Sequence, residues 1–246
     1  MFDKKVIKAV IFDLDGTLVD TLPLWDDIYI GTLSFFTKEK IDQNDFKNHQ
    51  KEYFSRKENI SGYQTYREHL IKKYCIDTTI ESFEEKYQEF ARSFLKKLVI
   101  YRYGADKFIK LLKQEEIICV IASACEKNSL DIYNNENENI KKACKIDEHF
   151  SYIFTNEDVN YIKPHPEVFL KALDELAKLG ITKDECIVIE DSLEGIKAAT
   201  AAGIETINIY HRFADNDREE IEKLATYSAK NYYELISSFL NKKMIL

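Results

Sequence analysis

Five short apolar runs constrain the fold of this chain more than any other feature of its sequence. Each is rich in Ile, Val or Phe, and most show no alternation of apolar and polar residues, which is typical of strands covered on both faces. The stretches between them have helical spacing, as in Pro166–Leu179, where Gly180 stands at the position of a helix-ending glycine. Alternating strands and helices predict an α/β fold with a doubly wound parallel sheet. The runs are Ala9–Leu14, Ile117–Ala122, Tyr152–Thr155, Cys186–Ile189 and Thr206–Ile209.

The stretch between the first two runs differs in character. Residues 22–98 contain no convincing buried strand, but Tyr, Phe, Lys and Glu recur there at helical spacing. We therefore predict a helical unit at residues 22–98, inserted into a core formed by residues 1–21 and 99–246. Another polar stretch, Asn134–Lys142, has low complexity and predicts a surface loop or a frayed helix end.

The charge balance and the cysteines argue against several classes of protein. The 246 residues carry 35 Lys and Arg against 43 Asp and Glu, and this net charge of −8 disfavours a nucleic-acid partner. No apolar run approaches the roughly 18 residues of a membrane-spanning helix, and the start of the chain lacks the pattern of a signal peptide. The 5 cysteines include no CxxC pair, so we predict neither disulfides nor a zinc site. We expect a cytoplasmic protein without a membrane partner, as a monomer or a weak homodimer.

Two acids follow the first apolar run, in the segment Phe12-Asp13-Leu14-Asp15-Gly16-Thr17-Leu18. Ligands of doubly wound sheets bind beyond the carboxyl ends of the strands, so these acids are expected at a binding edge. Two unpaired carboxylates repel each other unless a cation lies between them, and hard oxygen ligands suit Mg²⁺. Gly16 allows a tight turn and a close approach of the backbone. Two acids at this spacing alone would also fit a strand-end turn with helix-capping acids.

The segment IFDLDGTLVDT resembles the first motif of the haloacid dehalogenase-like superfamily almost letter for letter. The resemblance implies three further motifs at later strand ends, and the sequence supplies them in order. Ser123 follows the second apolar run, although a serine there is usually a turn residue. Lys163 precedes Pro164 in a stretch that leads into a helix. The fourth run ends in Glu190-Asp191-Ser192, with Gly195 beyond it, and Ser192 suits the N-cap of the next helix.

The resemblance covers essentially the whole chain. The insertion at residues 22–98 is similar to the helical cap of subfamily I of this superfamily. The segment Tyr103-Gly104-Ala105 resembles the P-G-A that commonly follows the cap, with Tyr in place of Pro. We expect the cap to move as a body, with hinges near Leu18–Leu22 and Ile100–Gly104.

The resemblance implies a mechanism of phosphoryl transfer. Asp13 would be the nucleophile that forms an aspartyl-phosphate, and Asp15 the general acid for the leaving alcohol and then the base for water. Asp20 and Thr21 are expected to orient the turn. The implied ligands of Mg²⁺ are the Asp13 carboxylate, the Asp15 backbone carbonyl, Asp191 and Glu190. The implied phosphate- and substrate-binding residues are Gly16, Thr17, Ser123, Ala124 and Lys163.

A Mg²⁺-dependent phosphatase of a small phosphorylated metabolite is the leading hypothesis. Asp15 disfavours metal-free dehalogenases, which lack this second acid. The alternative is a sugar phosphomutase that resembles β-phosphoglucomutase, because Ser123–Asn128 is similar to its S-A-S-K-N segment with one residue inserted. Its sugar-binding cap residues have no clear counterpart here, and Arg56 is the nearest candidate. A non-catalytic binding protein on the same fold is disfavoured by the intact acids, and the histidines and Cys125 are weak catalytic candidates.

Overall fold

The structure is a computed structural model that describes residues 6–55 and 63–241. Six short strands form one sheet: β1 (Ala9–Phe12), β2 (Ile118–Ala122), β3 (Tyr152–Phe154), β4 (Cys186–Glu190), β5 (Glu205–Ile209) and β6 (Tyr227–Ala229). Their order is β3-β2-β1-β4-β5-β6, and every neighbouring pair is parallel. The chain builds from β1 to one edge of the sheet and then from β4 to the other edge. This is the doubly wound arrangement that the sequence predicts.

Helices follow most strands of this core. They are α5 (Ala105–Gln114), α6 (Lys127–Asp131), α7 (Glu138–Cys144), α8 (Ile146–His149), α9 (Glu167–Lys178), α10 (Leu193–Ala201), α11 (Arg218–Leu224) and α12 (Tyr232–Leu240), with a π-helical turn η1 (Ile132–Glu136) and the 3₁₀ turns η2 (Asn156–Asp158), η3 (Lys183–Glu185) and η4 (Arg212–Asp217). No helix in the described part of the chain is both long enough and apolar enough to cross a membrane.

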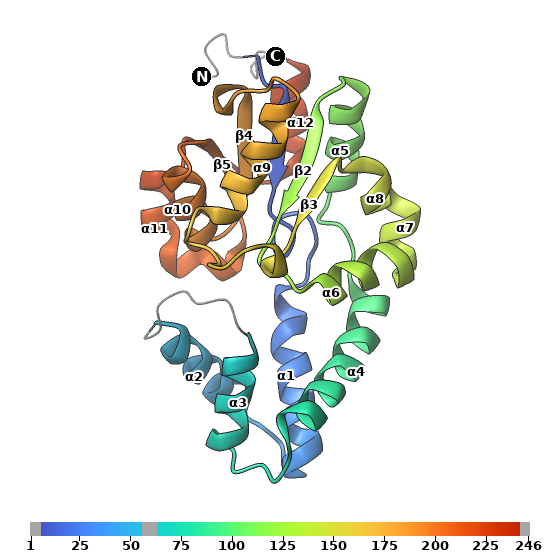
Figure 1. Ribbon diagram of the computed structural model, residues 1–246, viewed down its shortest axis with the longest axis vertical. Helices are drawn as coiled ribbons and strands as arrows, with labels where there is room; N and C mark the ends of the chain where they lie inside the picture. Colours follow the sequence, from blue (N-terminus) through green and yellow to red (C-terminus); the bar gives the residue numbers. More distant parts are fainter. Residues whose placement is uncertain (1–5, 56–62, 242–246) are drawn as a thin grey trace.

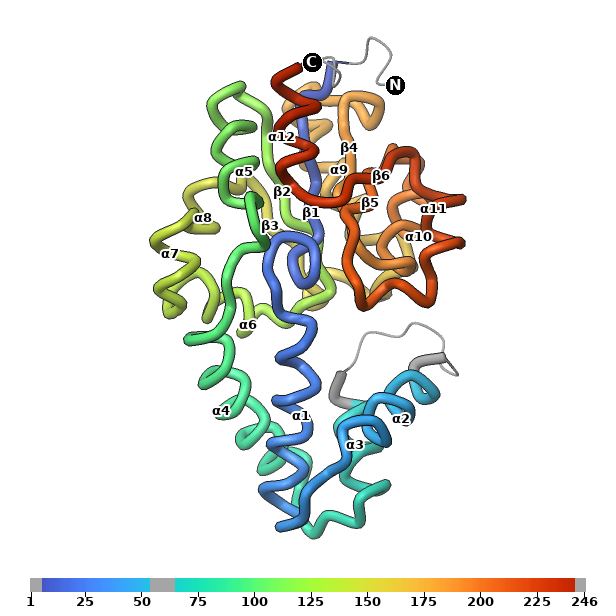
Figure 2. The backbone as a smooth tube through the Cα atoms, turned by 180° about the vertical axis from the view of Figure 1, so that it is seen from behind, coloured from blue at the N-terminus to red at the C-terminus, as the bar shows by residue number. Residues whose placement is uncertain are grey.

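Both faces of the sheet are covered, which explains why its central strands are apolar throughout. On one face, α5 and α12 pack with Val10 and Phe12 of β1, and Figure 2 shows both helices in front of the sheet. On the other face, α9 and α10 pack with Ala9 and Ile11. All four of these β1 side chains are completely buried. The core therefore consists of two apolar layers separated by the sheet.

Two sequence predictions about this core were wrong. The last strand, β6, was missed because Tyr227–Ala229 is short and contains no apolar run. Asn134–Lys142 is not a surface loop, and the alternative of a helix end describes only its first residues, since the stretch forms the end of η1 and then much of α7. One of its polar residues caps α7: Asn137 is completely buried, and its side chain accepts a hydrogen bond from the Ile140 N–H at 2.9 Å.

The described part of residues 22–98 is helical. It contains α1 (Leu22–Thr37), α2 (Gln43–Ser55), α3 (Tyr63–Lys73) and α4 (Ile80–Leu98). Figure 1 shows these helices together below the sheet, with α1 beside α4. The division of the chain into a core and a cap at these boundaries stays a prediction.

The chain passes between the core and these helices at two adjacent segments. The Asp20 N–H donates to the Ile100 carbonyl at 3.0 Å, and the Arg102 N–H donates to the Leu18 carbonyl at 2.8 Å. The two segments with predicted hinges are therefore hydrogen-bonded to each other. Their bending stays a prediction.

Candidate active site

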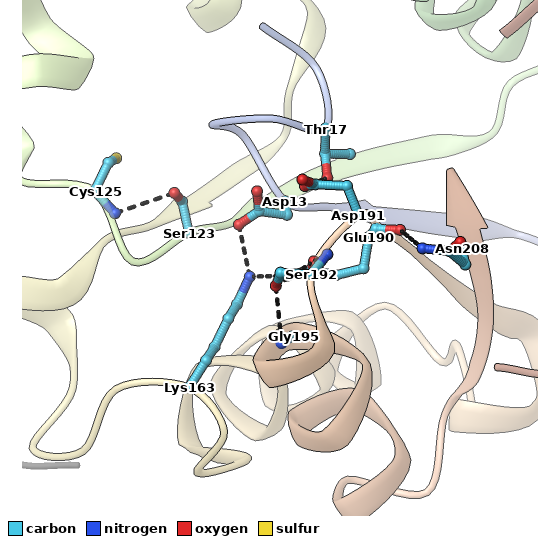
Figure 3. A network of polar contacts seen from close by, with 10 residues as sticks. All are labelled: Asp13, Thr17, Ser123, Cys125, Lys163, Glu190, Asp191, Ser192, Gly195 and Asn208. Atoms are coloured by element: carbon cyan, nitrogen blue, oxygen red, sulfur yellow. Dashed lines mark hydrogen bonds and ion pairs between the residues drawn. The ribbon is translucent and has the colours of Figure 1, made fainter. Parts of the chain in front are cut away.

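The carboxyl ends of β1, β2 and β4 lie side by side, and polar residues gather at this edge of the sheet (Figure 3). The strand order reverses between β1 and β4, which is the usual place for a ligand in doubly wound sheets. Asp13 follows β1 directly, and its N–H donates to the Ile189 carbonyl at 3.0 Å. Glu190 ends β4, Asp191 comes next, and Ser123 follows β2. The fold thus brings together acids that are far apart in the sequence.

Lys163 connects two of these acids. It lies in the loop between η2 and α9, and its Nζ is 2.6 Å from Asp13 Oδ1 and 2.6 Å from Glu190 Oε1. The exposed fractions of the three side chains are only 6%, 10% and 1%, in that order. Burial alone would lower the pKa of Lys163, but the two carboxylates raise it above its usual value. The lysine therefore stays charged.

A third acid gives the site an excess of negative charge. Asp191 joins Asp13 and Glu190 in a group in which one carboxylate oxygen from each residue lies within 4.8 Å of the other two. Burial and the charge of Glu190 raise the pKa of Asp191 to about 7. Burial also raises the pKa of Asp13, although Lys163 lowers it in part. Buried oxygen ligands with uncompensated charge fit a hard divalent cation such as Mg²⁺, and residues 6–55 and 63–241 hold no second such group.

Two glycines make room for these carboxylates. Gly16 has a φ of +89°, and a Cβ at this position would lie 2.5 Å from Asp191 Oδ2. Gly195 is in the first turn of α10, where a Cβ would lie 1.7 Å from Glu190 Oε1. A larger residue at either position would displace a carboxylate. Both glycines noted in the sequence motifs therefore have a packing role in the site.

Hydroxyl and amide donors hold the acids of this site in place. Thr17 Oγ1 donates to Asp191 Oδ1 at 2.7 Å. Ser192 donates to Glu190 Oε2 through its N–H at 2.9 Å and its hydroxyl at 3.0 Å. The same hydroxyl accepts from the Gly195 N–H, which makes Ser192 the N-cap of α10 as predicted. Thr17, which was expected among the phosphate-binding residues, is completely buried, and its hydroxyl contacts Asp191.

Asp15 belongs to a separate set of hydrogen bonds. Its Oδ1 accepts from the Thr21 hydroxyl at 2.6 Å and from the Tyr133 hydroxyl at 2.9 Å. Burial raises the pKa of Asp15, and these two hydrogen bonds lower it in part. A carboxyl with a raised pKa close to Asp13 is suited to give and take a proton. Thr21 contacts Asp15 directly, in keeping with the expectation that it orients this segment.

The turn after β2 supplies neutral groups. Ser123 is buried, and its Oγ accepts the Cys125 N–H at 3.1 Å, so the hydroxyl proton is available to a ligand. Figure 3 shows the Ser123 and Asp13 side chains next to each other. Ala124 is half-buried between Ser123 and Cys125. Burial raises the pKa of Cys125 well above its usual value, which disfavours a reactive thiolate at this position.

Several residues that support the site lie outside the four sequence motifs. The Arg102 guanidinium donates to the Gly16 carbonyl at 2.7 Å, and the Tyr232 hydroxyl donates to the Thr17 carbonyl at 3.0 Å. These two bonds fix the turn after β1 from parts of the chain that only tertiary packing brings near. Asn208 donates to the carbonyl of the last β4 residue at 3.2 Å. Of these three residues, only Asn208 could have been noticed in the sequence, because it is a polar residue within the apolar run Thr206–Ile209.

A second buried cation lies between the inserted helices and the core. Arg67 of α3 donates two hydrogen bonds of 2.9 Å to Glu84 of α4 and one of 2.9 Å to Glu126, at the start of α6. Its guanidinium carbon lies 3.9 Å from the centre of the Tyr87 ring. We call the surface between the inserted helices and the core at Arg67 the seam. Arg56, the candidate for sugar binding, lies outside the described residues.

Comparisons with known proteins agree with this geometry. Residues 10–209 match the sequence profile of the haloacid dehalogenase-like hydrolases. A phosphorylated carbohydrates phosphatase from Thermotoga maritima is 25% identical over 85% of this chain and 88% of its own. Hexitol phosphatase B from Escherichia coli is 26% identical over 88% of this chain and 90% of its own.

The fold is also found in a solved structure. CbbY from Rhodobacter sphaeroides, crystallised with phosphate, superposes with a TM-score of 0.71 and 21% identity over 94% of this chain and 96% of its own. The family profile spans all four motifs, from the acids after β1 to those at the end of β4. The chain therefore belongs to the haloacid dehalogenase-like hydrolase family.

Proposed function

We propose that this protein is a Mg²⁺-dependent phosphatase that acts through an aspartyl-phosphate on Asp13. The observation that carries the proposal is the position of Asp13 at the end of β1, 2.6 Å from Lys163 and beside two further buried acids. A carboxylate between a lysine and a cation site can approach a phosphate, because the positive charges reduce their mutual repulsion. The catalytic residues in this proposal are Asp13 and Asp15.

The first step forms the covalent intermediate. An Asp13 carboxylate oxygen attacks phosphorus, and the bond between phosphorus and the leaving oxygen breaks. Asp15, whose carboxyl has a raised pKa, gives its proton to the leaving oxygen, so the alcohol departs neutral. Lys163, the Ser123 hydroxyl and the Ala124 N–H bind the oxygens of the transferred group, and the Gly16 backbone approaches it closely.

The second step releases phosphate. A water molecule attacks the phosphorus of the aspartyl-phosphate, and Asp15, now ionised, takes the proton of that water. The bond between phosphorus and the Asp13 oxygen breaks, which returns Asp13 to its carboxylate form. Asp15 ends the cycle protonated, as it began, so the proton balance closes.

The acidic group at the strand ends would hold the metal. Its ligands would be the Asp13 carboxylate, Asp191, Glu190 and the backbone carbonyl of Asp15. Bound Mg²⁺ would shield the charge of the phosphate from these acids. Thr17 keeps Asp191 oriented for this task through its hydrogen bond of 2.7 Å.

The relatives support a class of substrate. The two related phosphatases are named for phosphorylated carbohydrates and for a hexitol. We therefore propose a small phosphorylated carbohydrate or polyol, bound between a core of residues 1–21 and 99–246 and a cap of residues 22–98. Phosphatase is preferred over phosphomutase because both of these relatives are phosphatases. The monomeric or weakly dimeric state stays a prediction.

A substrate panel tests this function. Phosphate release is measured from hexose, pentose and hexitol phosphates with Mg²⁺, with EDTA and with Ca²⁺. We expect activity with Mg²⁺, loss in EDTA and inhibition by Ca²⁺, whose larger and looser coordination misplaces the reacting groups. β-Glucose 1-phosphate is included with and without glucose 1,6-bisphosphate. Formation of glucose 6-phosphate that outruns phosphate release by about tenfold or more would support the phosphomutase instead.

A pair of variants tests the nucleophile. Asp13→Asn should lower kcat by more than about 10³-fold, as is usual when a catalytic nucleophile is removed. Asp184→Asn makes the same chemical change at an exposed position and should leave kcat unchanged. Activity of Asp13→Asn above about 1% of the wild-type value would remove Asp13 from this role. Circular dichroism of both variants checks that the fold is intact.

A further inference from the structure

Asp15 receives two hydrogen bonds on only one of its oxygens. The Tyr133 hydroxyl donates to Oδ1 at 2.9 Å, and the Thr21 hydroxyl donates to the same oxygen at 2.6 Å. Among the described residues, none donates a hydrogen bond to Oδ2. An oxygen that already accepts two hydroxyl protons has little room for a proton of its own. In a neutral Asp15 the acidic proton therefore lies on Oδ2.

The packing around Tyr133 holds it in this contact. Its side chain is completely buried, and it lies in the π-helical turn η1, a rare conformation that often occurs at functional sites. Just after this turn, Asn137 donates to the carbonyls of Leu95 at 2.6 Å and Val99 at 3.0 Å, at the end of α4. Within η1, Glu136 accepts a hydrogen bond of 2.9 Å from an arginine of α4. The turn is thus fixed between the active site and the last inserted helix.

Thr21 lies at the other place where the core meets the inserted helices. It directly precedes α1, the first inserted helix, whereas Tyr133 packs at the end of the last one. Both donors to Asp15 therefore come from places where the core meets the inserted helices. Both hydroxyls donate to Oδ1, so together they fix the orientation of the Asp15 carboxyl.

We propose that Tyr133 is a positioning residue for Asp15: together with Thr21 it occupies Oδ1 and so turns Oδ2, the oxygen that carries the proton, toward the leaving group. This inference rests on the proposed function. As the bond between phosphorus and the leaving oxygen breaks, the proton on Oδ2 moves to that oxygen. Oδ1 keeps both hydrogen bonds throughout and stabilises the carboxylate that is left.

A series of phosphate esters with different leaving groups tests this role. Tyr133→Phe removes only the hydroxyl, and kcat/KM is measured for 4-nitrophenyl, phenyl and 2-phenylethyl phosphate. The nitrophenolate leaves without a proton, so the loss there should stay within about threefold. The alkoxide needs the proton, so the loss should grow to about 30- to 100-fold for the 2-phenylethyl ester. A purely structural role would lower kcat/KM equally for all three esters, and an equal loss would overturn the proposal.

Two further variants complete the experiment. Tyr101→Phe removes another buried hydroxyl, one that donates to the Cys144 carbonyl at 2.6 Å and does not contact Asp15. It should give the same relative loss for every ester. Thr21→Val removes the second donor to Oδ1 and should steepen the dependence in the same direction as Tyr133→Phe. A flat series for Thr21→Val would contradict the proposal even if Tyr133→Phe failed to fold.

The same assay separates this inference from the proposed function. Wild-type release of 4-nitrophenolate that is lost in Asp13→Asn supports the phosphatase. If that activity is present and the leaving-group dependence of Tyr133→Phe matches the wild type, the positioning role alone is overturned. If the wild type releases phosphate neither from these esters nor from the sugar and hexitol phosphates of the substrate panel, both proposals are overturned.

Discussion

Lys163 and Arg67 are both buried cations between two carboxylates, but their surroundings differ. The carboxylates that bind Lys163 both belong to the core, and their exposed fractions are 10% and 1%. The carboxylates that bind Arg67 come from α4 and from the start of α6, and their exposed fractions are 26% and 19%. Water can therefore solvate the partners of Arg67 but hardly those of Lys163.

This difference separates a charged binding site, around Lys163, from a contact between the inserted helices and the core, around Arg67. Around Lys163 a third buried acid, Asp191, gives the group more carboxylates than the one lysine can neutralise, so the group is suited to hold a metal. Around Arg67 the two partners lie on opposite sides of the seam, and each can be rehydrated if the arginine moves away. We infer that the first arrangement is rigid and that the second can open. Four predictions test this contrast.

Lys163→Met should have the largest effect because it leaves two buried carboxylates without their cation. Breaking a buried ion pair in this way typically costs about 3–5 kcal/mol in the free energy of unfolding. We also expect phosphate release to fall by more than about 10³-fold. Urea unfolding and the phosphate assay measure both effects. Lys178→Met removes an exposed lysine and should change neither, whereas a destabilisation by Lys163→Met below about 1 kcal/mol would mean that the site is well hydrated.

The response of stability to pH should also reveal the excess charge. The pKa of Asp191 is about 7 in the folded protein and about 3.9 in the unfolded chain. Between these values the folded protein binds a proton that the unfolded chain has lost, so metal-free stability should fall as the pH rises through this window. Mg²⁺ replaces the proton, and at about 100 times its dissociation constant it should add about 2.7 kcal/mol.

Thermal unfolding with and without Mg²⁺ measures this effect. The rise in Tm on adding Mg²⁺ should be larger at pH 8 than at pH 5, because protons compete with the metal at the lower pH. Asp191→Asn should remove the part of this pH dependence that comes from Asp191, whereas the raised pKa values of Asp13 and Asp15 keep the rest. An equal Mg²⁺ effect at both pH values would show that Asp191 does not titrate in this range.

The strand-end acids were predictable from the sequence because local rules place them. A buried parallel strand must end at the same edge as its neighbours, so Asp13, Glu190 and Asp191 had to converge once the strands were recognised. The inserted helices were predictable in the same way, because residues 22–98 show helical spacing and no strand pattern. These predictions needed only the period of the apolar residues and the direction of the strands.

The supporting residues could not be predicted, because tertiary packing and not a local sequence pattern brings them to the site. Tyr133 lies next to a polar stretch that reads as a loop, and only tertiary packing against α4 orders that stretch as helix around the buried Asn137 and Ile140. Arg102 reaches the Gly16 carbonyl across 86 positions of sequence. Arg67 is one of several charged residues on α3, and nothing local marks it as buried. Side chains that stabilise the site from a distance depend on the fold, which a sequence pattern does not contain.

The seam should respond to a third substitution. Glu126→Gln weakens the bond between Arg67 and the core, whereas Glu84→Gln leaves that bond in place. The partners are partly exposed, so we expect a loss of stability of no more than about 1 kcal/mol in either variant. Hydrogen exchange of the α6 amides should speed up by roughly fivefold in Glu126→Gln, the factor that matches about 1 kcal/mol, and change little in Glu84→Gln.

A phosphate mimic sharpens the same comparison. If the cap closes over the site, beryllium fluoride should slow exchange along the seam in the wild type. It should slow exchange less in Glu126→Gln, because the closed state has lost one of its contacts. Equal protection in both proteins would show that Arg67 does not hold the seam closed, and unchanged exchange in the wild type would count against cap closure.

The smallest effect should come from a histidine pair within the inserted helices. His49 Nε2 of α2 lies 2.9 Å from His69 Nε2 of α3, so one ring must be a neutral acceptor. Burial, followed by the charges of Lys73 and His69, lowers the pKa of His49 below its usual value. The folded protein therefore binds fewer protons here than the unfolded chain, in which the pKa is about 6.5. Stability from this pair is present above about pH 6.5 and is lost as the pH falls.

This direction is opposite to that of the core, so the two regions can be separated in one titration. Because the core acids are the same in both proteins, the Tm of the wild type minus that of His49→Gln should fall by about 1–2 °C between pH 7 and pH 5, a shift expected for a few tenths of a kcal/mol. In His49→Gln the remaining imidazole no longer has a positive neighbour on protonation. His149→Gln changes a histidine of α8 in the core, so the same subtraction made with His149→Gln should show no such fall. If the difference between the wild type and His49→Gln does not change in acid, the two imidazoles already share their proton without cost, and the pair does not link pH to the stability of the inserted helices.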